Sequence, residues 1–305
     1  MKITAATYNI QFGRGIDGLH DLDRTAREVA GADIVAFQEV AQHWARNAYD
    51  DQALGLAERL GFYHVFGAGF DVAAGGPPGT AVPRHRRRTF GNMVASRWPI
   101  ESSRTMLLPK VALARFYDLQ RCVVEAVVAT PVGRLRVYSL HLTHVSSGLR
   151  LPQVRALLDF VADAPENGAP WSGEPVPGWA EGPEEPTLPE PALVMGDMNF
   201  TADSPEYAQV CGEKDPGLGR IVRRAGLRDA WVAAGHAEES GVSLRNEYLG
   251  ELRIDHVFAT QSVARHVVSM RIDETARGSD HFPVFVDLEV PPGGFQNTMG
   301  SAGPG

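Results

Sequence analysis

The sequence predicts a single α/β domain built on mixed β-sheets, and three observations indicate this class. Residues 2–40 alternate strand, helix and strand. Two strand-like segments, 123–129 and 135–140, are separated only by a short Pro- and Gly-containing turn, which is typical of an antiparallel hairpin. Further short apolar strands follow at intervals. Because hairpins occur alongside helical crossovers, a mixed arrangement is favoured over a uniformly parallel one.

The N-terminal elements follow from hydrophobic periodicity. Lys2–Asn9 is rich in β-forming residues, and apolar residues fall on one helical face over about 22–30, after the candidate caps Asp21 and Asp23. A short apolar strand is predicted at 34–37. A second helix is expected over about 44–60, ending at Gly61 as a C-terminal glycine cap.

The remaining elements are read in the same way. We predict a strand at 92–96, the hairpin above, a helix at about 151–162, a helix at 204–210 and strands at 192–195, 253–259 and 283–290. Two stretches are expected to be loops: the Gly/Pro-rich segment 68–88, which ends in a basic run, and a Pro-rich insertion at about 164–191. Residues 1–290 are thus assigned to one domain, and 291–305 to a tail that does not pack.

Composition narrows the class of protein. A formal charge of −8 argues against a general nucleic-acid coat protein, and two cysteines are too few for a disulfide framework or a Cys-rich zinc site. We expect both cysteines to be reduced and structural. The N-terminus enters a strand directly and the chain contains no long apolar run, so we expect a cytoplasmic protein without a transmembrane segment. The sequence does not indicate an oligomeric state.

Polar residues follow or precede several of the apolar strands. They are Asn9, Glu39, His141, Asp197 with Asn199, and Asp280 with His281, while Asp255 lies inside a strand. Strand ends deliver side chains to one rim of a sheet, so these groups are expected to meet. Carboxylates and amides are the ligands that Mg²⁺ prefers, and an imidazole can hold a phosphate. For any one of them, a helix cap, a turn or a structural histidine is an alternative.

The segment Gly196-Asp197-Met198-Asn199 is the most informative of these. Asp197 and Asn199 share one face if strand geometry continues, and together they could orient a water and a phosphoryl oxygen. An Asx turn before the next helix is the alternative. His144 and His256 are read as structural. For His281, a carboxylate on one ring nitrogen would fix the tautomer, and Asp255 is a candidate for that partner.

In this order, these motifs resemble those of the endonuclease/exonuclease/phosphatase superfamily. The resemblance runs from Thr7-Tyr8-Asn9-Ile10 through Phe37-Gln38-Glu39, Ser139-Leu140-His141-Leu142-Thr143, Gly196-Asp197-Met198-Asn199 and Arg253-Ile254-Asp255-His256 to Ser279-Asp280-His281. It implies a four-layer sandwich of two packed mixed β-sheets flanked by helices. It also implies divalent-metal-dependent hydrolysis of phosphate esters, as in deoxyribonucleases, sphingomyelinases and inositol-polyphosphate phosphatases.

The resemblance also assigns roles to the residues. Glu39, with Asn9 and Asp280 nearby, would bind Mg²⁺ or Mn²⁺, and Asp197 would orient or deprotonate the attacking water. Asn199 and His141 would hold the scissile phosphate, while His281, oriented by Asp255, would stabilise the charged transition state. Arg121 is a further candidate for a phosphate contact, because an Arg at a similar position lies near the site in related proteins.

Three functions remain open at this point. The first is hydrolysis of a small-molecule or lipid-headgroup phosphodiester or phosphomonoester; the second is a nuclease; the third is a non-catalytic binding module with the same fold. The net acidity and the lack of an interleaved basic and aromatic stripe favour the first over nucleic acid. The basic run 84–88 is either a solvated loop or a site for an additional anionic group.

Overall fold

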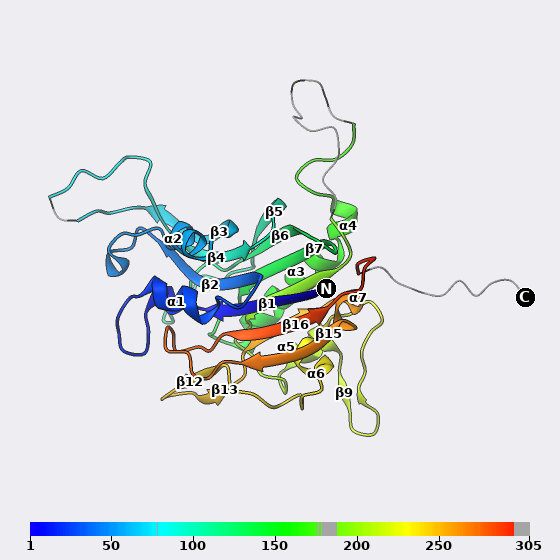
Figure 1. Cartoon of the computed structure of the whole chain (residues 1–305). Coiled ribbons are helices and arrows are strands. Elements are labelled where there is room, and N and C mark those ends of the chain that lie inside the picture. The colour runs from blue at the N-terminus through cyan, green and yellow to red at the C-terminus, as the bar shows by residue number, and fades with distance from the viewer. Residues whose placement is uncertain (78, 175, 177, 179–187, 296–305) are drawn as a thin grey trace, which may run out of the picture.

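The fold is a four-layer sandwich, in which two mixed β-sheets pack face to face and helices cover their outer sides (Figure 1). The computed structural model describes residues 1–77, 79–174, 176, 178 and 188–295. The predicted fold class is confirmed. No helix in this described part of the chain is long and apolar enough to cross a membrane.

The first sheet has six strands and a single parallel pair at its centre. Its order is β15 (Val267–Ile272), β16 (Val284–Glu289), β1 (Lys2–Asn9), β2 (Ile34–Gln42), β4 (Arg87–Ser96) and β3 (Tyr63–Ala73). β1 and β2 run parallel, joined by the predicted helical crossover, and the other neighbours are antiparallel.

The second sheet repeats this plan. Its order is β11 (Arg228–Asp229), β14 (Asp255–Ala259), β8 (Ala192–Asp197), β7 (Gly133–His141), β6 (Cys122–Thr130) and β5 (Ile100–Leu107). β7 and β8 form the one parallel pair, and β6 and β7 form the predicted hairpin.

Helices cover both outer faces. α1 (Leu22–Glu28) and α2 (Gln52–Leu60) pack on the first sheet, and α3 (Ser147–Ala162) and α5 (Pro205–Cys211) on the second. Asp21, Asp51 and Ser204 each accept a backbone N–H at a helix start, which satisfies a donor that the helix leaves free. Gly61 adopts the left-handed conformation expected of a cap.

Short elements complete the chain. They are the turns η1 (Gln11–Gly13) and η2 (Ala45–Asn47), the helices α4 (Ala164–Asn167), α6 (Ala230–Ala233) and α7 (Gln261–Ala264), and two small hairpins, β9 (Lys214–Asp215) with β10 (Gly219–Arg220) and β12 (Leu244–Asn246) with β13 (Gly250–Leu252). The two cysteines, Cys122 and Cys211, are buried and free.

Three apolar layers hold the sandwich together. Side chains such as Ile34 and Val137 fill the space between the sheets, while others such as Tyr8 and Val194 face the helices. Strands covered on both faces are apolar at nearly every position, which is why 34–37 and 192–195 lack alternation. The large buried area between layers gives the strand ends a rigid support.

Several sequence-based expectations about the elements were wrong. Segment 68–88 is not a loop throughout, since β3 runs to Ala73 and β4 begins at Arg87, and β3, β5 and β15 were not predicted as strands. These strands are half-exposed edge strands or carry glycines, so their hydrophobic pattern is weak. β2 continues past Phe37 to Gln42. Of the Pro-rich insertion, residues 175, 177 and 179–187 lie outside the described part, and α4 lies at its start.

The expectation that the tail does not pack is also wrong for its first residues. Phe295 is only 4% exposed and joins the layer between the two sheets, with its ring 6.0 Å from that of His266. Residues 296–305, which belong to the same expectation, lie outside the described residues.

Candidate active site

The predicted site residues converge on one rim of the sandwich because both parallel pairs end there. Asn9 ends β1, and His141 and Asp197 end β7 and β8, where they are register partners. Asp255 begins β14, which is antiparallel to β8, and lies opposite Asp197. Residues separated by most of the chain therefore reach one cluster.

Asp197 is at the centre of this cluster. Its Oδ2 accepts a hydrogen bond from Asn9 Nδ2 at 2.9 Å and lies 3.2 Å from His141 Nε2 and 3.7 Å from His281 Nε2. Its Oδ1 accepts the backbone N–H of Asn199 at 3.0 Å. Burial raises the pKa of Asp197 to about 7, with the charge of Asp255 adding to the rise. A carboxylate with such a pKa can accept a proton near neutral pH.

Gly196 lets the strand carrying Asp197 approach its neighbour. A Cβ at this position would lie 1.9 Å from the carbonyl oxygen of Leu140 on β7. No side chain fits at that distance, so the glycine is required by packing of the two parallel strands. The register of His141 opposite Asp197 depends on this close approach.

His281 is held by Asp255. Its Nδ1 lies 2.8 Å from Asp255 Oδ2, which also accepts the hydroxyl of Ser243 at 2.7 Å. Burial alone would lower the pKa of His281, but the carboxylates of Asp255 and Asp197 raise it to about 10. The imidazole is therefore a cation at neutral pH, with Nδ1 oriented by Asp255 and Nε2 directed to Asp197 and Asn9. The sequence could not establish that Asp255 and His281 meet.

Glu39 reaches the site from a β-bulge, not from a strand end as expected. The pairing of β2 with β4 shifts register between Phe37 and Val40, and Glu39 has a left-handed backbone with φ of 59°. A bulge turns a side chain out of the regular alternation. Glu39 Oε1 consequently lies 3.4 Å from Asn9 Nδ2 and 3.8 Å from His141 Nδ1.

Burial and charged neighbours change the pKa of Glu39. Burial raises the pKa of Glu39, the guanidinium of Arg121 opposes the rise, and Asp280 adds to it. Asp280 precedes β16 and accepts the hydroxyl of Ser279 at 3.3 Å. Two acidic groups near each other in a largely buried place are costly unless a cation compensates them.

The donor set fits a divalent cation. Glu39, Asp280 and the Asn9 amide offer hard oxygen atoms of the kind that Mg²⁺ and Mn²⁺ prefer. Within the residues described, His141 Nδ1 and Asp255 Oδ1 are buried polar atoms without a hydrogen-bond partner. Asn9 directs Nδ2 to the carboxylates and its Oδ1 accepts the N–H of Gln11, so Asn9 would ligate a cation only with its amide turned over, whereas Glu39 and Asp280 are carboxylates and need no such change.

A second group of possible metal ligands lies beside Glu39 and Asp280. Asp197, Asp255 and His281 each offer one ligand atom, and these atoms lie within 4.8 Å of one another. Because Asp255 Oδ2 and His281 Nδ1 already bond each other, we regard this set as a proton-handling network, and the oxygen-rich Glu39 side as the better match for Mg²⁺.

The remaining candidates lie at the edge of this cluster. Asn199 has a left-handed backbone and donates from Nδ2 to the carbonyl of Leu142. Burial, followed by the charge of Arg121, holds the pKa of His141 well below its usual value, so His141 is a neutral imidazole. Arg121 is 8% exposed, and its Nε has no partner among the described residues.

Some residues at the site were not expected from the sequence. Ser243 anchors Asp255 through its hydroxyl, and nothing in the sequence marks a lone serine in an irregular segment for that task. His144, read as structural, lies 3.5 Å from an Arg121 nitrogen. His256, also read as structural, is buried between Arg253 and the carbonyl of Phe200, with its ring stacked on Phe258.

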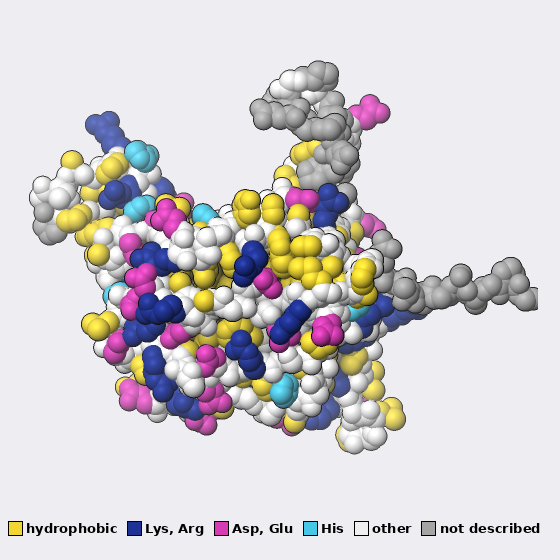
Figure 2. All heavy atoms as spheres, in the orientation of Figure 1, with side chains coloured by type: hydrophobic (Ala, Val, Ile, Leu, Met, Phe, Trp, Pro, Cys, Tyr) yellow, Lys and Arg dark blue, Asp and Glu magenta, His cyan; other side chains and the backbone are white. Residues whose placement is uncertain are grey.

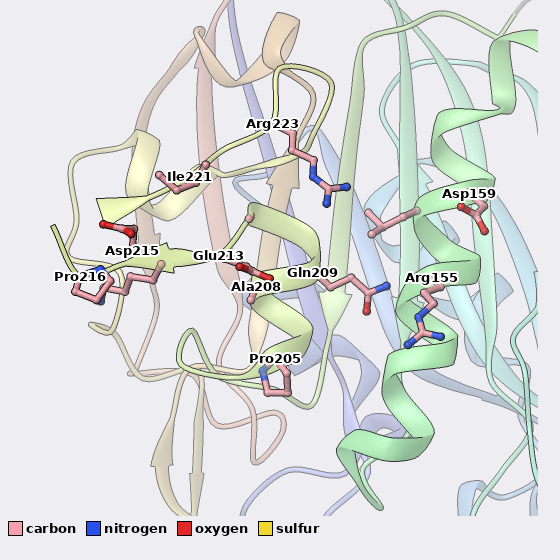
Figure 3. Close-up of a pocket in the computed structure, with 13 residues that line it drawn as sticks. Arg155, Asp159, Pro205, Ala208, Gln209, Glu213, Asp215, Pro216, Ile221 and Arg223 are labelled. Carbon is pink, nitrogen blue, oxygen red and sulfur yellow. The ribbon is translucent and has the colours of Figure 1, made fainter. Parts of the chain in front are cut away.

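A large cavity lies elsewhere on the molecule. It has a volume of about 970 Å³ and is lined by residues of α3, α5 and the β9–β10 hairpin, among them Arg155, Gln209 and Glu213 (Figure 3). None of the predicted site residues lines it. Its lining mixes both signs of charge, and among the described residues none of its side chains has a buried polar atom without a partner, so the cluster around Asp197 remains the better candidate for chemistry.

Comparisons with known proteins agree with this architecture. A sequence model described as the endonuclease/exonuclease/phosphatase family matches residues 6–281. Among solved structures, a mannosyl-6-phosphatase from Bacteroides thetaiotaomicron superposes with a TM-score of 0.61 at 19% identity, covering 94% of this chain and 99% of that chain. An endonuclease/exonuclease/phosphatase from Beutenbergia cavernae gives 0.62 at 21% identity, covering 94% and 71%.

A humanized D. rerio TDP2 is a third similar structure. Its TM-score is 0.55 at 16% identity, and the match covers 95% of this chain and 99% of that chain. At these identities the solved structures establish the fold alone, so the reaction has to be argued from the site.

Proposed function

The chain belongs to the endonuclease/exonuclease/phosphatase family, and from that premise we propose that it is a divalent-metal-dependent phosphoesterase acting on a small-molecule or lipid-headgroup phosphate ester. The observation that carries the proposal is the buried carboxylate of Asp197 between a neutral His141 and a cationic His281. Hydrolysis of a phosphate ester needs a base for water and positive charge on the phosphoryl oxygens, and this arrangement offers both.

Each residue has a defined task in the proposed reaction. Asp197 orients the attacking water through Oδ2 and accepts its proton as the new oxygen–phosphorus bond forms and the bond from phosphorus to the ester oxygen breaks; the leaving alkoxide takes a proton from water. His281, protonated and held by Asp255, offers Nε2–H to a phosphoryl oxygen, whose charge grows in the transition state. His141 and Asn199 position the phosphate by hydrogen bonding, and Arg121 adds a fixed positive charge nearby.

Glu39, Asp280 and Asn9 would hold the metal. A divalent cation held by these residues would supply positive charge to polarise the phosphoryl group and to offset charge on the leaving oxygen. Burial, with a smaller contribution from the charge of Asp280, raises the pKa of Glu39, so a cation at this place would be favourable.

Three further observations support a small substrate. On the face shown in Figure 2, Lys/Arg and Asp/Glu side chains are interspersed, and no continuous basic stripe is seen. The net charge is −8, which is unfavourable for binding a polyanion. One structurally similar protein is described as a mannosyl-6-phosphatase, which illustrates a small phosphate ester as the substrate of this fold.

The test is turnover of a phosphate-ester panel. The protein is assayed with Mg²⁺, with Mn²⁺ and with EDTA on bis(p-nitrophenyl) phosphate, p-nitrophenyl phosphate, sugar phosphates and plasmid DNA. We expect metal-dependent hydrolysis of small esters that EDTA abolishes, and loss of turnover in Asp197→Ala and His281→Ala. Plasmid nicking at low enzyme would favour the nuclease, and no turnover at all would favour a binding module.

A further inference from the structure

A cluster of arginine and aromatic side chains borders the proposed metal-binding residues. The guanidinium of Arg46 lies 4.0 Å from the ring centroid of Trp44 and 4.2 Å from that of Phe12. The guanidinium of Arg88 lies 4.9 Å from the centroid of the same Trp44 ring. We name these four residues, Phe12, Trp44, Arg46 and Arg88, the rim cluster.

The topology places the rim cluster beside the active site. Phe12 follows Asn9 by three residues at the end of β1, and Trp44 follows Glu39 by five residues beyond the end of β2. Since β1 and β2 are parallel neighbours, both segments leave the sheet at the same edge. In agreement, the negative charge of Glu39 acts to raise the pKa of Arg46, although burial lowers it overall.

The Trp44 ring beneath the two guanidinium groups is held by a hydrogen bond and by aromatic packing. The indole nitrogen of Trp44 donates to the carbonyl of Thr89 at 2.7 Å, and the ring packs against Phe70 and Phe90 with centroids 5.3 and 6.2 Å away. Stacking on an aromatic face holds a guanidinium flat and leaves its N–H edge free to bind an anion.

Among the described residues, no acidic side chain lies within ion-pair distance of either cation of the rim cluster, and Glu39 acts on Arg46 only from farther away. Within the described part of the chain, Arg46 and Arg88 form no ion pair, and Arg88 Nε is buried without a hydrogen-bond partner. The arginines that flank them on β4 differ: Arg87, next along the strand, is 2.8 Å from Asp71, and Arg97, just beyond the other end of β4, is 2.9 Å from Asp33. Arg46 is exposed and Arg88 is half-buried, so water reaches part of both guanidinium groups, but two like charges over one ring, with the buried Arg88 Nε unfilled, favour binding of an anion at this place.

We infer that the rim cluster binds a second anionic group of the substrate, so that the preferred substrate is a small phosphate ester carrying a further phosphate or carboxylate. This inference rests on the proposed phosphoesterase function. It gives a task to one residue of the basic run 84–88, since Arg88 joins the cluster while Arg87 is paired with Asp71. Both cations share one indole, and this compactness suits a single anionic group better than an extended polyanion.

The catalytic test compares two esters of one sugar. We expect kcat/KM for fructose 1,6-bisphosphate to exceed that for fructose 6-phosphate in the wild type. Arg46→Ala and Arg88→Ala should each reduce that preference about tenfold through KM, because a charge-assisted hydrogen bond to the second group is lost. Turnover of bis(p-nitrophenyl) phosphate should not change, and Arg46→Lys should retain part of the preference.

Arg87→Ala is the matched control, since it removes a neighbouring arginine that is already paired. An unchanged preference in Arg46→Ala and Arg88→Ala would overturn the inference. So would an equal loss on all esters, which indicates a structural role. A short single-stranded oligonucleotide that is hydrolysed better than the bisphosphate, and that needs Arg46, would assign the cluster to nucleic acid and overturn it as well.

A binding measurement separates this inference from the proposed function. Calorimetric titration of the protein with inorganic pyrophosphate in EDTA needs neither metal nor turnover. Binding that is lost in Arg46→Ala and Arg88→Ala, and kept in Arg87→Ala, supports the subsite even if no ester is hydrolysed. Equal binding by all three variants and the wild type would contradict it.

Discussion

At the scale of single residues, burial and neighbouring charges give similar side chains of the site different protonation states. His141 and His281 are both buried imidazoles, yet one is neutral and the other cationic. The difference comes from Asp255, which lies 2.8 Å from His281, while His141 has Arg121 nearby. The arrangement gives the proposed reaction a neutral phosphate contact and a cationic one.

Replacement of Asp255 by Asn tests whether the Asp255 carboxylate keeps His281 protonated. Removing the carboxylate charge should lower the pKa of His281, so the protonated imidazole is lost at a lower pH. The alkaline limb of the kcat/KM profile should therefore move to lower pH. Because the imidazole itself is kept, kcat at neutral pH should fall by no more than about 100-fold, the lower end of what a general acid or base contributes. Steady-state kinetics against pH measure both effects.

Ser243→Ala is the matched control for that change, since it removes a hydrogen bond to Asp255 but keeps the charge. Its pH profile should stay near that of the wild type. An alkaline limb that does not move in Asp255→Asn would contradict the role given to Asp255.

At the scale of elements, small backbone irregularities decide which side chains reach the rim. The bulge at Glu39 turns a residue inside β2 toward the site, and Gly196 allows β8 to approach β7. Both features depend on pairing with a distant strand. A regular strand in either place would direct the side chains differently.

Gly196→Ala should damage fold and site together. Its methyl group would lie 1.9 Å from the carbonyl oxygen of Leu140, so β7 and β8 have to separate. We expect a loss of at least about 2 kcal/mol in the free energy of unfolding, as for other overpacked positions, with reduced activity at temperatures where the variant is folded. Urea denaturation measures the first effect.

Gly61→Ala provides a comparison for Gly196→Ala. Gly61 is a helix cap whose added Cβ would meet nothing within 4 Å, although its backbone is left-handed. The Gly61→Ala variant should therefore lose only about 1 kcal/mol in the free energy of unfolding, which is the cost of placing alanine in the left-handed conformation. Equal losses in the two variants would contradict the close-approach argument.

At the scale of the whole molecule, the two sheets share one apolar layer that joins the ends of the chain. Phe295 packs into this layer after the last strand, and the backbone N–H of Val290 donates to the carbonyl of Met1. Residues just after 290 are therefore part of the folded structure.

Phe295→Ala should lower the free energy of unfolding by about 3 kcal/mol, because a buried phenyl ring is replaced by a cavity. Leu218→Ala, at a residue that is 80% exposed, is the control and should have little effect. Chemical denaturation monitored by tryptophan fluorescence gives both values. A negligible loss in Phe295→Ala would mean that this contact does not stabilise the fold.

Metal binding should also be visible as stability of the whole chain. A ligand present at about 100 times its dissociation constant stabilises the folded state by about 2.7 kcal/mol. Mg²⁺ or Mn²⁺ should therefore raise Tm in differential scanning calorimetry, and EDTA should reverse the rise. Glu39→Gln should abolish the shift, whereas Glu58→Gln, on the outer helix α2, should retain it. An equal shift in both variants would place the metal elsewhere.

The sequence by itself determined most of the fold and the chemical identity of the candidate groups. Apolar strands and amphipathic helices are local patterns, so β1, β8 and the β6–β7 hairpin could be predicted, while the half-exposed edge strands β3, β5 and β15 could not. Polar residues placed beside buried strands also predicted that these groups meet at one rim, as they do.

Only the tertiary structure decided how these groups are arranged. Pairing between distant segments brings Asp255 to His281 and Ser243 to Asp255. It also creates the bulge that carries Glu39. The stacking of Arg46 and Arg88 on Trp44 likewise joins two loops. Such contacts are set by the packing of the two sheets, and no local pattern in the sequence encodes them.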